Sequence, residues 1–189
     1  MYKDFYKIES NGLTPQKGMF LLAEPFMRNS FFTRSVILLI SHNEEGSMGL
    51  VLNQISNEKL NDFVPEFNYL EKIPLYQGGP IGNDRLFFVH NLHKDIRDSI
   101  KLNNDYWLNG NLEDIKDYVL QGHSLNTHIR FVKGYAGWSP NQLQEEIDSG
   151  SWLLTPTIDP NQFSWKKAMQ KLGGKYAVWA KFPIFPSFN

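Results

Sequence analysis

The sequence predicts an α+β fold in a single compact domain, with a mostly antiparallel sheet and helices packed outside it. Three short apolar runs, rich in Val, Ile, Leu and Phe, occupy residues 19–23, 36–40 and 49–52, and turn residues bound them. Runs this short are typical of buried strands, because helices usually need about 10 residues or more. Helix signals appear later in the chain, without the steady strand-helix alternation of a doubly wound parallel sheet.

Length and composition are consistent with one soluble domain. At 189 residues, folding buries roughly 70% of the surface of the unfolded chain, so a sizeable core is possible. Hydrophobic residues make up 41% of the chain and aromatic residues 14%, which predicts an aromatic-rich core. We expect residues 1–17 to form a peripheral arm and residues 18–189 to form the domain, including an aromatic C-terminal tail that docks on it.

Charge and cysteine content exclude several classes of protein. Nineteen basic and twenty acidic residues give a net charge of −1, so no global positive field attracts nucleic acid. The absence of cysteine excludes disulfides and thiolate metal sites. The N-terminus lacks a signal-peptide pattern, and no run approaches the length of a membrane span. We therefore expect a cytoplasmic protein with no membrane partner and no cofactor.

Turn signals organise the strands into hairpins. The runs at 36–40 and 49–52 should pair in a hairpin that turns at residues 43–46. Residues 73–77 and 86–89 flank a glycine-rich loop at 78–84 and are expected to form a second hairpin. Residues 57–67 carry an amphipathic pattern that predicts a short helix, limited by Pro65. Further strands are expected at 99–102, 106–108, 127–133 and 152–155.

Three later segments carry helix caps. Asn111 should cap a helix over 111–121 that Gly122 ends. Ser139, followed by Pro140, is typical of a helix start. The Asp-Pro-Asn-Gln sequence at 159–162 repeats this signature ahead of a helix that ends at residues 173–174. A stretch with five aromatic residues follows and should pack as the tail.

Four motifs together resemble the YqgE/AlgH family of bacterial proteins. They are FTRSV at 32–36, HNEEGSMGLVLN at 42–53, YQGGP at 76–80 and GYAGWSPNQL at 134–143. The likeness extends from about residue 18 to the tail. It implies a cytosolic protein with one α+β domain and a coiled, bifurcated sheet. The family is labelled a transcriptional regulator tied to alginate production, and it has no agreed catalytic residues.

The polar motif residues cluster at 42–49, 78–85 and 134–138, which we interpret as loops that converge on one face. Functional residues are often found on loops that a rigid sheet holds in place. The candidate functional residues are Arg34, Ser35, His42, Glu45, Asn53, Gly79, Pro80, Arg85, Gly134, Tyr135 and Trp138.

Each chemical interpretation has a structural alternative. His42, beside Glu44 and Glu45, is either an acid-base residue or a residue that shapes the hairpin turn. Ser35 lacks the G-x-S-x-G context of a nucleophile. The glycine-rich segments suit either phosphate binding or close backbone packing, and close packing is favoured. Arg34 either binds an anion or pairs with Glu44 or Glu45.

His90 and His93 form an H-x-x-H pair near Asp95. No third ligand motif supports a metal site, so we interpret them as surface histidines and expect no metal.

Three hypotheses of function follow. The leading one is a non-enzymatic regulatory or binding protein with an unknown protein or small-molecule partner. The alternative is an enzyme, such as a hydrolase, that uses His42 and its acidic neighbours and therefore needs a deep pocket there. Direct DNA binding is disfavoured, because the helix that follows Ser139 is acidic.

Overall fold

The computed structural model describes residues 7–27, 30–67, 73–125, 128–159 and 163–183. Within these ranges the chain forms ten strands, four α-helices and three 3-10 turns. The strands are β1 (Phe20–Ala23), β2 (Val36–Asn43), β3 (Gly46–Val51), β4 (Ile55–Lys59), β5 (Pro74–Gln77), β6 (Ile81–His90), β7 (Ile100–Lys101), β8 (Trp107–Leu108), β9 (Ile129–Trp138) and β10 (Trp152–Thr155). The helices are α1 (Leu112–Leu120), α2 (Gln142–Asp148), α3 (Trp165–Leu172) and α4 (Gly174–Trp179).

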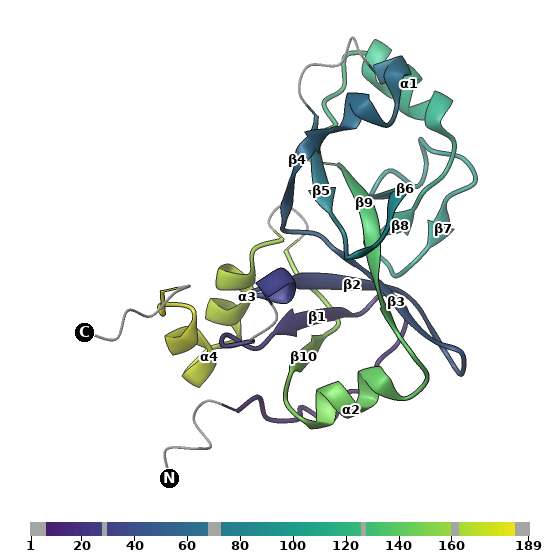
Figure 1. Ribbon diagram of the computed structural model, residues 1–189. Coiled ribbons are helices and arrows are strands. Elements are labelled where there is room, and N and C mark those ends of the chain that lie inside the picture. The colour runs from purple at the N-terminus through teal and green to yellow at the C-terminus, as the bar shows by residue number, and fades with distance from the viewer. Residues whose placement is uncertain (1–6, 28–29, 68–72, 126–127, 160–162, 184–189) are drawn as a thin grey trace.

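The predicted α+β class is confirmed, with a mostly antiparallel sheet. The main strand order is β10-β1-β2-β3-β9-β6-β8-β7, while β5 pairs with β9 and β4 pairs with β5. Among these pairings, only β5 with β9 is parallel. Strand β9 runs through both halves of the molecule (Figure 1): residues 136–138 pair with β3, and residues 131–133 pair with β5 and β6. The sheet therefore divides at β9.

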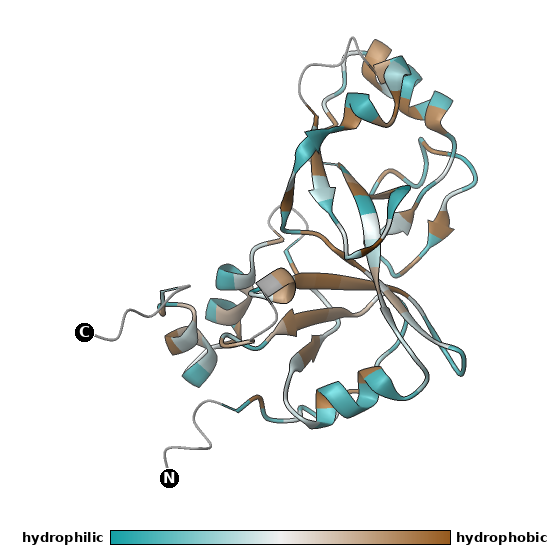
Figure 2. Cartoon of the chain, in the orientation of Figure 1, coloured by the Kyte–Doolittle hydropathy of each residue, from teal (hydrophilic) through white to brown (hydrophobic). Residues whose placement is uncertain are grey.

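The predicted hairpin of β2 and β3 is confirmed, with its turn between Asn43 and Gly46. Away from the hairpin tip, both faces of these strands are buried, because α2 covers one face and α3 and α4 cover the other. Side chains alternate along a strand, so a strand buried on both sides needs an unbroken apolar run. This explains the continuous hydrophobic colour of β1 and β2 in Figure 2.

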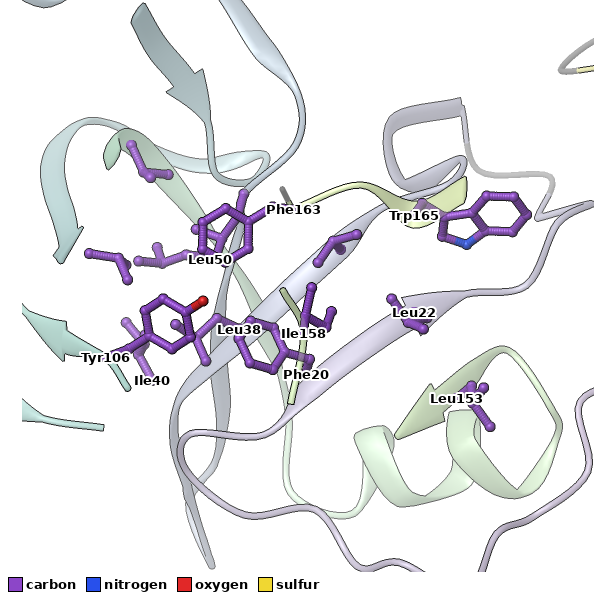
Figure 3. Close-up of a cluster of buried hydrophobic side chains, with 14 of the residues drawn as sticks. Phe20, Leu22, Leu38, Ile40, Leu50, Tyr106, Leu153, Ile158, Phe163 and Trp165 are labelled. Carbon is purple, nitrogen blue, oxygen red and sulfur yellow. The ribbon is translucent and has the colours of Figure 1, made fainter. Parts of the chain in front are cut away.

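Three clusters of buried side chains fill the interior. The largest lies between the sheet and α3 and α4, and it contains Phe20, Leu38 and Trp165 (Figure 3). A second packs beneath α2, and a third lies beneath α1 and the 3-10 turns η2 (Leu60–Asp62) and η3 (Pro65–Phe67). The prediction of an aromatic-rich core therefore holds for the largest cluster.

Two predicted elements are wrong in the half that contains β4–β8. The segment 57–67 forms the end of β4 and the turns η2 and η3, because Pro65 interrupts the pattern and Lys59 pairs with Pro74 of β5. The predicted hairpin of β5 and β6 does not form. The two strands pair instead with β9, β5 in parallel and β6 antiparallel, so β9 lies between them.

Helix α1 begins after Asn111, whose side chain accepts a hydrogen bond from the Glu113 N–H, as predicted. Helix α2 begins later than expected. Its cap is Asn141, which has a φ of 65°, and the Ser139 N–H donates to Gln142 Oε1 at 2.9 Å. Ser139 therefore forms a hydrogen bond with the first residue of α2, but Asn141 is the residue that caps the helix.

The C-terminal region departs from its cap signature. Helix α3 is capped by Ser164, which follows the Asp159 signature, and residues 160–162 lie outside the described part of the chain. The start of the expected tail is the helix α4, which buries Trp179. Residues 184–189 also lie outside the description. No helix among the described residues is long and apolar enough to cross a membrane.

Candidate functional site

The three motif segments lie side by side at the centre of the sheet. Ser47 pairs with Trp138 and Met48 with Gly137, while Ile81 pairs with Tyr135. The expectation that these segments meet is therefore correct. The expectation that the three segments are loops is largely wrong. Residues 134–138 form the end of β9, residues 81–85 the start of β6, and residues 42–49 the tip of the β2–β3 hairpin with only 44–45 between the strands. The functional role of the assembled residues stays a prediction.

Glycine allows the chain to cross β9 closely. A side-chain carbon on Gly79 would lie 1.8 Å from the carbonyl carbon of Tyr135, and one on Gly78 would lie 2.4 Å from the Gly134 carbonyl oxygen. Gly134 has a φ of 68°, which favours glycine. The chain thus passes over β9 between β5 and β6. The glycine motifs serve close packing, as the sequence favoured over phosphate binding.

His42 lies at the tip of the β2–β3 hairpin. Its Nδ1 is 2.7 Å from Ser47 Oγ, on the strand opposite. Glu44 and Glu45 are exposed, and among the described contacts neither bonds to His42. The Asn43 side chain accepts a hydrogen bond from the Glu45 N–H within the turn. The pair of His42 and Ser47 thus joins the two strands at the tip.

Trp138 continues this row of side chains toward α2. Its indole Nε1 donates to Glu146 Oε2 at 2.9 Å, and Trp152 Nε1 donates to the same oxygen at 2.7 Å. The two indole rings meet edge to face, with centroids 6.0 Å apart. Trp138 is 7% exposed. It therefore ties β9 to α2 and β10 and offers little surface to a ligand.

Arg34, Ser35 and Asn53 lie apart from this centre. Arg34 precedes β2, and the six positions from Val36 to His42 span roughly 20 Å along an extended strand. Ser35 is fully buried, and its Oγ accepts a hydrogen bond from Gln54 Nε2. Asn53 accepts from the Val36 N–H and donates to the Arg34 carbonyl. The three residues therefore fix the base of the hairpin.

The Arg34 side chain binds the C-terminal region. Its Nη2 donates to the carbonyl oxygens of Phe182 and Pro183, at 2.5 and 3.0 Å. The guanidinium carbon lies 5.0 Å from the Trp165 ring centroid, and burial lowers the pKa of Arg34. The proposed pairing with Glu44 or Glu45 is therefore wrong. Arg34 Nη2 is occupied by backbone oxygens, whereas its buried Nε has no hydrogen-bond partner among the described residues.

On the face of β9 opposite Trp138, three exposed residues (Ile81, Arg85 and Gly137) lie beside the half-buried Met48 and Tyr135. We call Met48, Ile81, Arg85, Tyr135 and Gly137 the crossing surface. Ile81 is 43% exposed, and the Arg85 guanidinium lies 6.0 Å from the Tyr135 ring centroid. A side-chain carbon at Gly137 would contact both Ile81 and Tyr135. Pro80, also exposed, precedes this surface.

The sequence did not single out Met48, Ile81 or Gly137 as surface residues. Ile81 stands among turn residues and resembles a loop position. Its exposure follows from the register of β6 on β9, which brings it beside Tyr135. The one signal in the sequence that could have indicated an exposed apolar residue was the isolated position of Ile81 within a segment of turn residues.

His90 is buried, so its interpretation as a surface histidine is wrong. Its Nε2 donates to the Asn109 carbonyl at 2.9 Å, and its Nδ1 accepts from the Leu92 N–H at 3.2 Å. Burial lowers the pKa of His90. His93 stacks on Trp107, with ring centroids 4.4 Å apart. Among the described residues, no group of three potential ligands could hold a metal.

An AlgH-like family model matches residues 20–177. The chain belongs to the AlgH-like family. A UPF0301 protein of Bacteroides thetaiotaomicron is 44% identical, over 98% of this chain and 97% of its own length. One from Parabacteroides distasonis is 40% identical, over 100% of this chain and 98% of its own length. The resemblance inferred from the four motifs is therefore confirmed.

Two solved structures resemble this AlgH-like chain. The crystal structure of protein DIP2367 from Corynebacterium diphtheriae has a TM-score of 0.75 at 26% identity, covering 93% of this chain and 95% of that one. The solution structure of AlgH from Pseudomonas aeruginosa has a TM-score of 0.63 at 25% identity, covering 92% and 98%. The fold is thus shared across nearly the whole length.

Proposed function

We propose that this AlgH-like protein is a non-enzymatic regulatory protein that binds a partner at the crossing surface. The observation that carries the proposal is that the exposed residues Ile81 and Arg85 lie beside the half-buried Tyr135 where the sheet divides. Aromatic residues, methionine and arginine are enriched at protein interfaces, and clustered anchors supply most of the binding energy. A protein partner in the cytoplasm fits this chemistry.

The backbone beneath the surface supports a binding role. Close packing of Gly79 on Tyr135 fixes the positions of both backbone segments, the one at residues 78–80 and the end of β9. Binding sites on rigid elements lose less entropy on association than sites on mobile loops. The crossing surface therefore presents its side chains in a preorganised arrangement.

Direct DNA binding is not part of the proposal. Glu145 and Asp148 are exposed on α2, and the net charge of the chain is −1. Phosphate backbones require an excess of basic side chains. A regulatory role would therefore operate through a bound protein.

The test is chemical cross-linking in cells followed by mass spectrometry, with Ile81→Asp as the variant. Aspartate at an exposed position should keep the fold and oppose an apolar contact. We expect wild type to cross-link a defined partner and Ile81→Asp to lose it. Leu120→Asp, at a residue 75% exposed on α1, is the matched control and should retain the partner. Equal capture by both variants would contradict the proposal.

The enzyme alternative rests on one contact, the 2.7 Å separation of His42 Nδ1 and Ser47 Oγ. A nucleophile and a base need this proximity, and also a group that orients the base. Ser47 is only 9% exposed. We expect no reaction of Ser47 with a fluorophosphonate probe, measured by intact mass. Labelling that His42→Ala abolishes would favour the hydrolase.

A further inference from the structure

A cavity of about 310 Å³ lies between α3 and the strands β1 and β10. It shares no lining residue with the crossing surface. Cavities that hold small molecules range from about 300 to 1,000 Å³, so this one suits a small ligand. The proposed partner binding does not use it.

The floor of the cavity is apolar. Leu22 comes from β1, Ile158 from the segment after β10, and Ala168 from α3. Leu22 and Ile158 belong to the largest buried cluster and lie near one another in Figure 3. Leu172, also in the lining, is 42% exposed. A ligand that covers Leu172 and Ala168 removes exposed apolar atoms from water, which favours an apolar body.

The rim carries an excess of positive charge. Lys167 and Lys171 are four residues apart on α3, so their side chains lie on the same face of the helix. Asp159 is the single carboxylate of the lining. Thr157 adds a hydroxyl group. Within the described part of the chain, Lys171 Nζ forms no ion pair.

We propose that this cavity binds a small organic carboxylate. Its apolar body lies on Leu22, Ile158 and Ala168, and its carboxylate pairs with the Lys171 ammonium. Lys167 adds positive potential one helical turn away. An inorganic anion would leave the floor uncovered, while a neutral apolar molecule would leave the Lys171 ammonium without a counter-charge. The inference concerns a site separate from the crossing surface, so each can fail alone.

The experiment is a titration of the full chain with hexanoate, followed by backbone amide NMR shifts. Acetate and 1-hexanol are the matched probes, because each lacks one of the two features. We expect saturable shifts in α3 and β10 with hexanoate. Binding of 1-hexanol should be at least about fivefold weaker, the factor that an ion pair of about 1 kcal/mol supplies. Binding of acetate should also be at least about fivefold weaker, because acetate keeps the carboxylate but lacks the apolar chain that covers the floor. Equal binding of 1-hexanol would overturn the carboxylate assignment.

Two variants place the site. Lys171→Glu replaces attraction by repulsion and should weaken hexanoate binding about tenfold, while Lys166→Glu, on the same helix outside the lining, should not. Ala168→Phe should fill the cavity and abolish binding. Because Ala168→Phe can disturb the fold, the thermal midpoint of this variant is measured together with its binding. If Ala168→Phe unfolds, Lys171→Glu provides the test. Unchanged binding in Lys171→Glu would overturn the proposal.

Discussion

The two halves of the sheet both have an apolar core, but they differ in the charged pairs that accompany it. In the half made of β1, β2, β3 and β10, the core residues of both faces are aliphatic or aromatic and almost fully buried. In the half made of β4–β8 and the start of β9, polar contacts are prominent. Arg97 forms a bidentate pair with Asp114, and Lys133 pairs with Glu58 below the Phe63 ring.

This difference explains where a pattern of residues is informative. Burial of apolar surface is non-directional and roughly proportional to area, so an aliphatic run is enough to specify a core strand. Polar contacts depend on geometry between residues distant in sequence. The first half could therefore be predicted from its runs, whereas the second required the register of β9.

The largest effect is expected where the second half crosses the first. Gly79→Ala places a carbon 1.8 Å from the Tyr135 backbone. No side-chain movement can relieve this clash, because the nearest atoms on Tyr135 are backbone atoms. We expect a loss of about 4 kcal/mol or more in the free energy of unfolding, measured by urea denaturation, or no folding. Gly137→Ala is the control. Its nearest contact would be 3.3 Å, to a flexible Ile81 atom, so we expect a loss below about 1 kcal/mol. Equal losses would remove the crossing as the reason for the glycine.

The next effect tests whether the half made of β1, β2, β3 and β10 also depends on a polar contact. Asn53→Ala leaves the buried Val36 N–H and the Arg34 carbonyl without their partner. An unsatisfied buried donor costs about 1–3 kcal/mol, so we expect a loss of about 2–3 kcal/mol in urea denaturation. Asn57→Ala, at an exposed position of β4, should change stability by less than about 0.5 kcal/mol. A neutral Asn53→Ala would show that burial alone holds this half.

Glu146 tests the link between α2 and the sheet. Its Oε2 accepts both the Trp138 and the Trp152 indole N–H. Glu146→Ala should lower the free energy of unfolding by about 2 kcal/mol, because two largely buried donors lose their acceptor. The measurement is urea denaturation followed by tryptophan fluorescence. Glu145→Ala, exposed on the same helix, is the control and should be near neutral; a matching loss there would point to the removal of negative charge near the start of α2 instead.

The smallest effect is a pH dependence of the free energy of unfolding that arises in the half made of β4–β8 and the start of β9. Burial keeps the pKa of His90 below its unfolded value of about 6.5. Below that pH the unfolded chain binds a proton that the folded chain does not. Stability is therefore complete above about pH 6.5 and falls as pH decreases toward the folded pKa. His90→Gln should flatten this part of the profile in denaturation measured across pH. An unchanged slope would assign the effect to other groups.

Particular residues show how far the sequence reached into the candidate site. It identified the segments of His42, Gly79 and Tyr135 and their convergence. It did not separate Arg34, Ser35 and Asn53, which share motifs with these residues but fix the far end of the hairpin. A motif records neighbours along the chain, whereas the six positions of β2 from Val36 to His42 separate the base of the hairpin from its tip by roughly 20 Å.

By itself, the sequence determined the α+β class, the family, and the strands β1, β2, β3 and β10. These could be predicted because apolar runs, caps and turn residues act over short distances along the chain. Tertiary structure alone decided that β9 separates β5 from β6, that His90 is buried and that Ile81 and Arg85 meet Tyr135 in the open. Those outcomes depend on strand register and on one close backbone crossing at Gly79. Both involve contacts between segments about fifty residues apart, which leave no periodic signal in either segment.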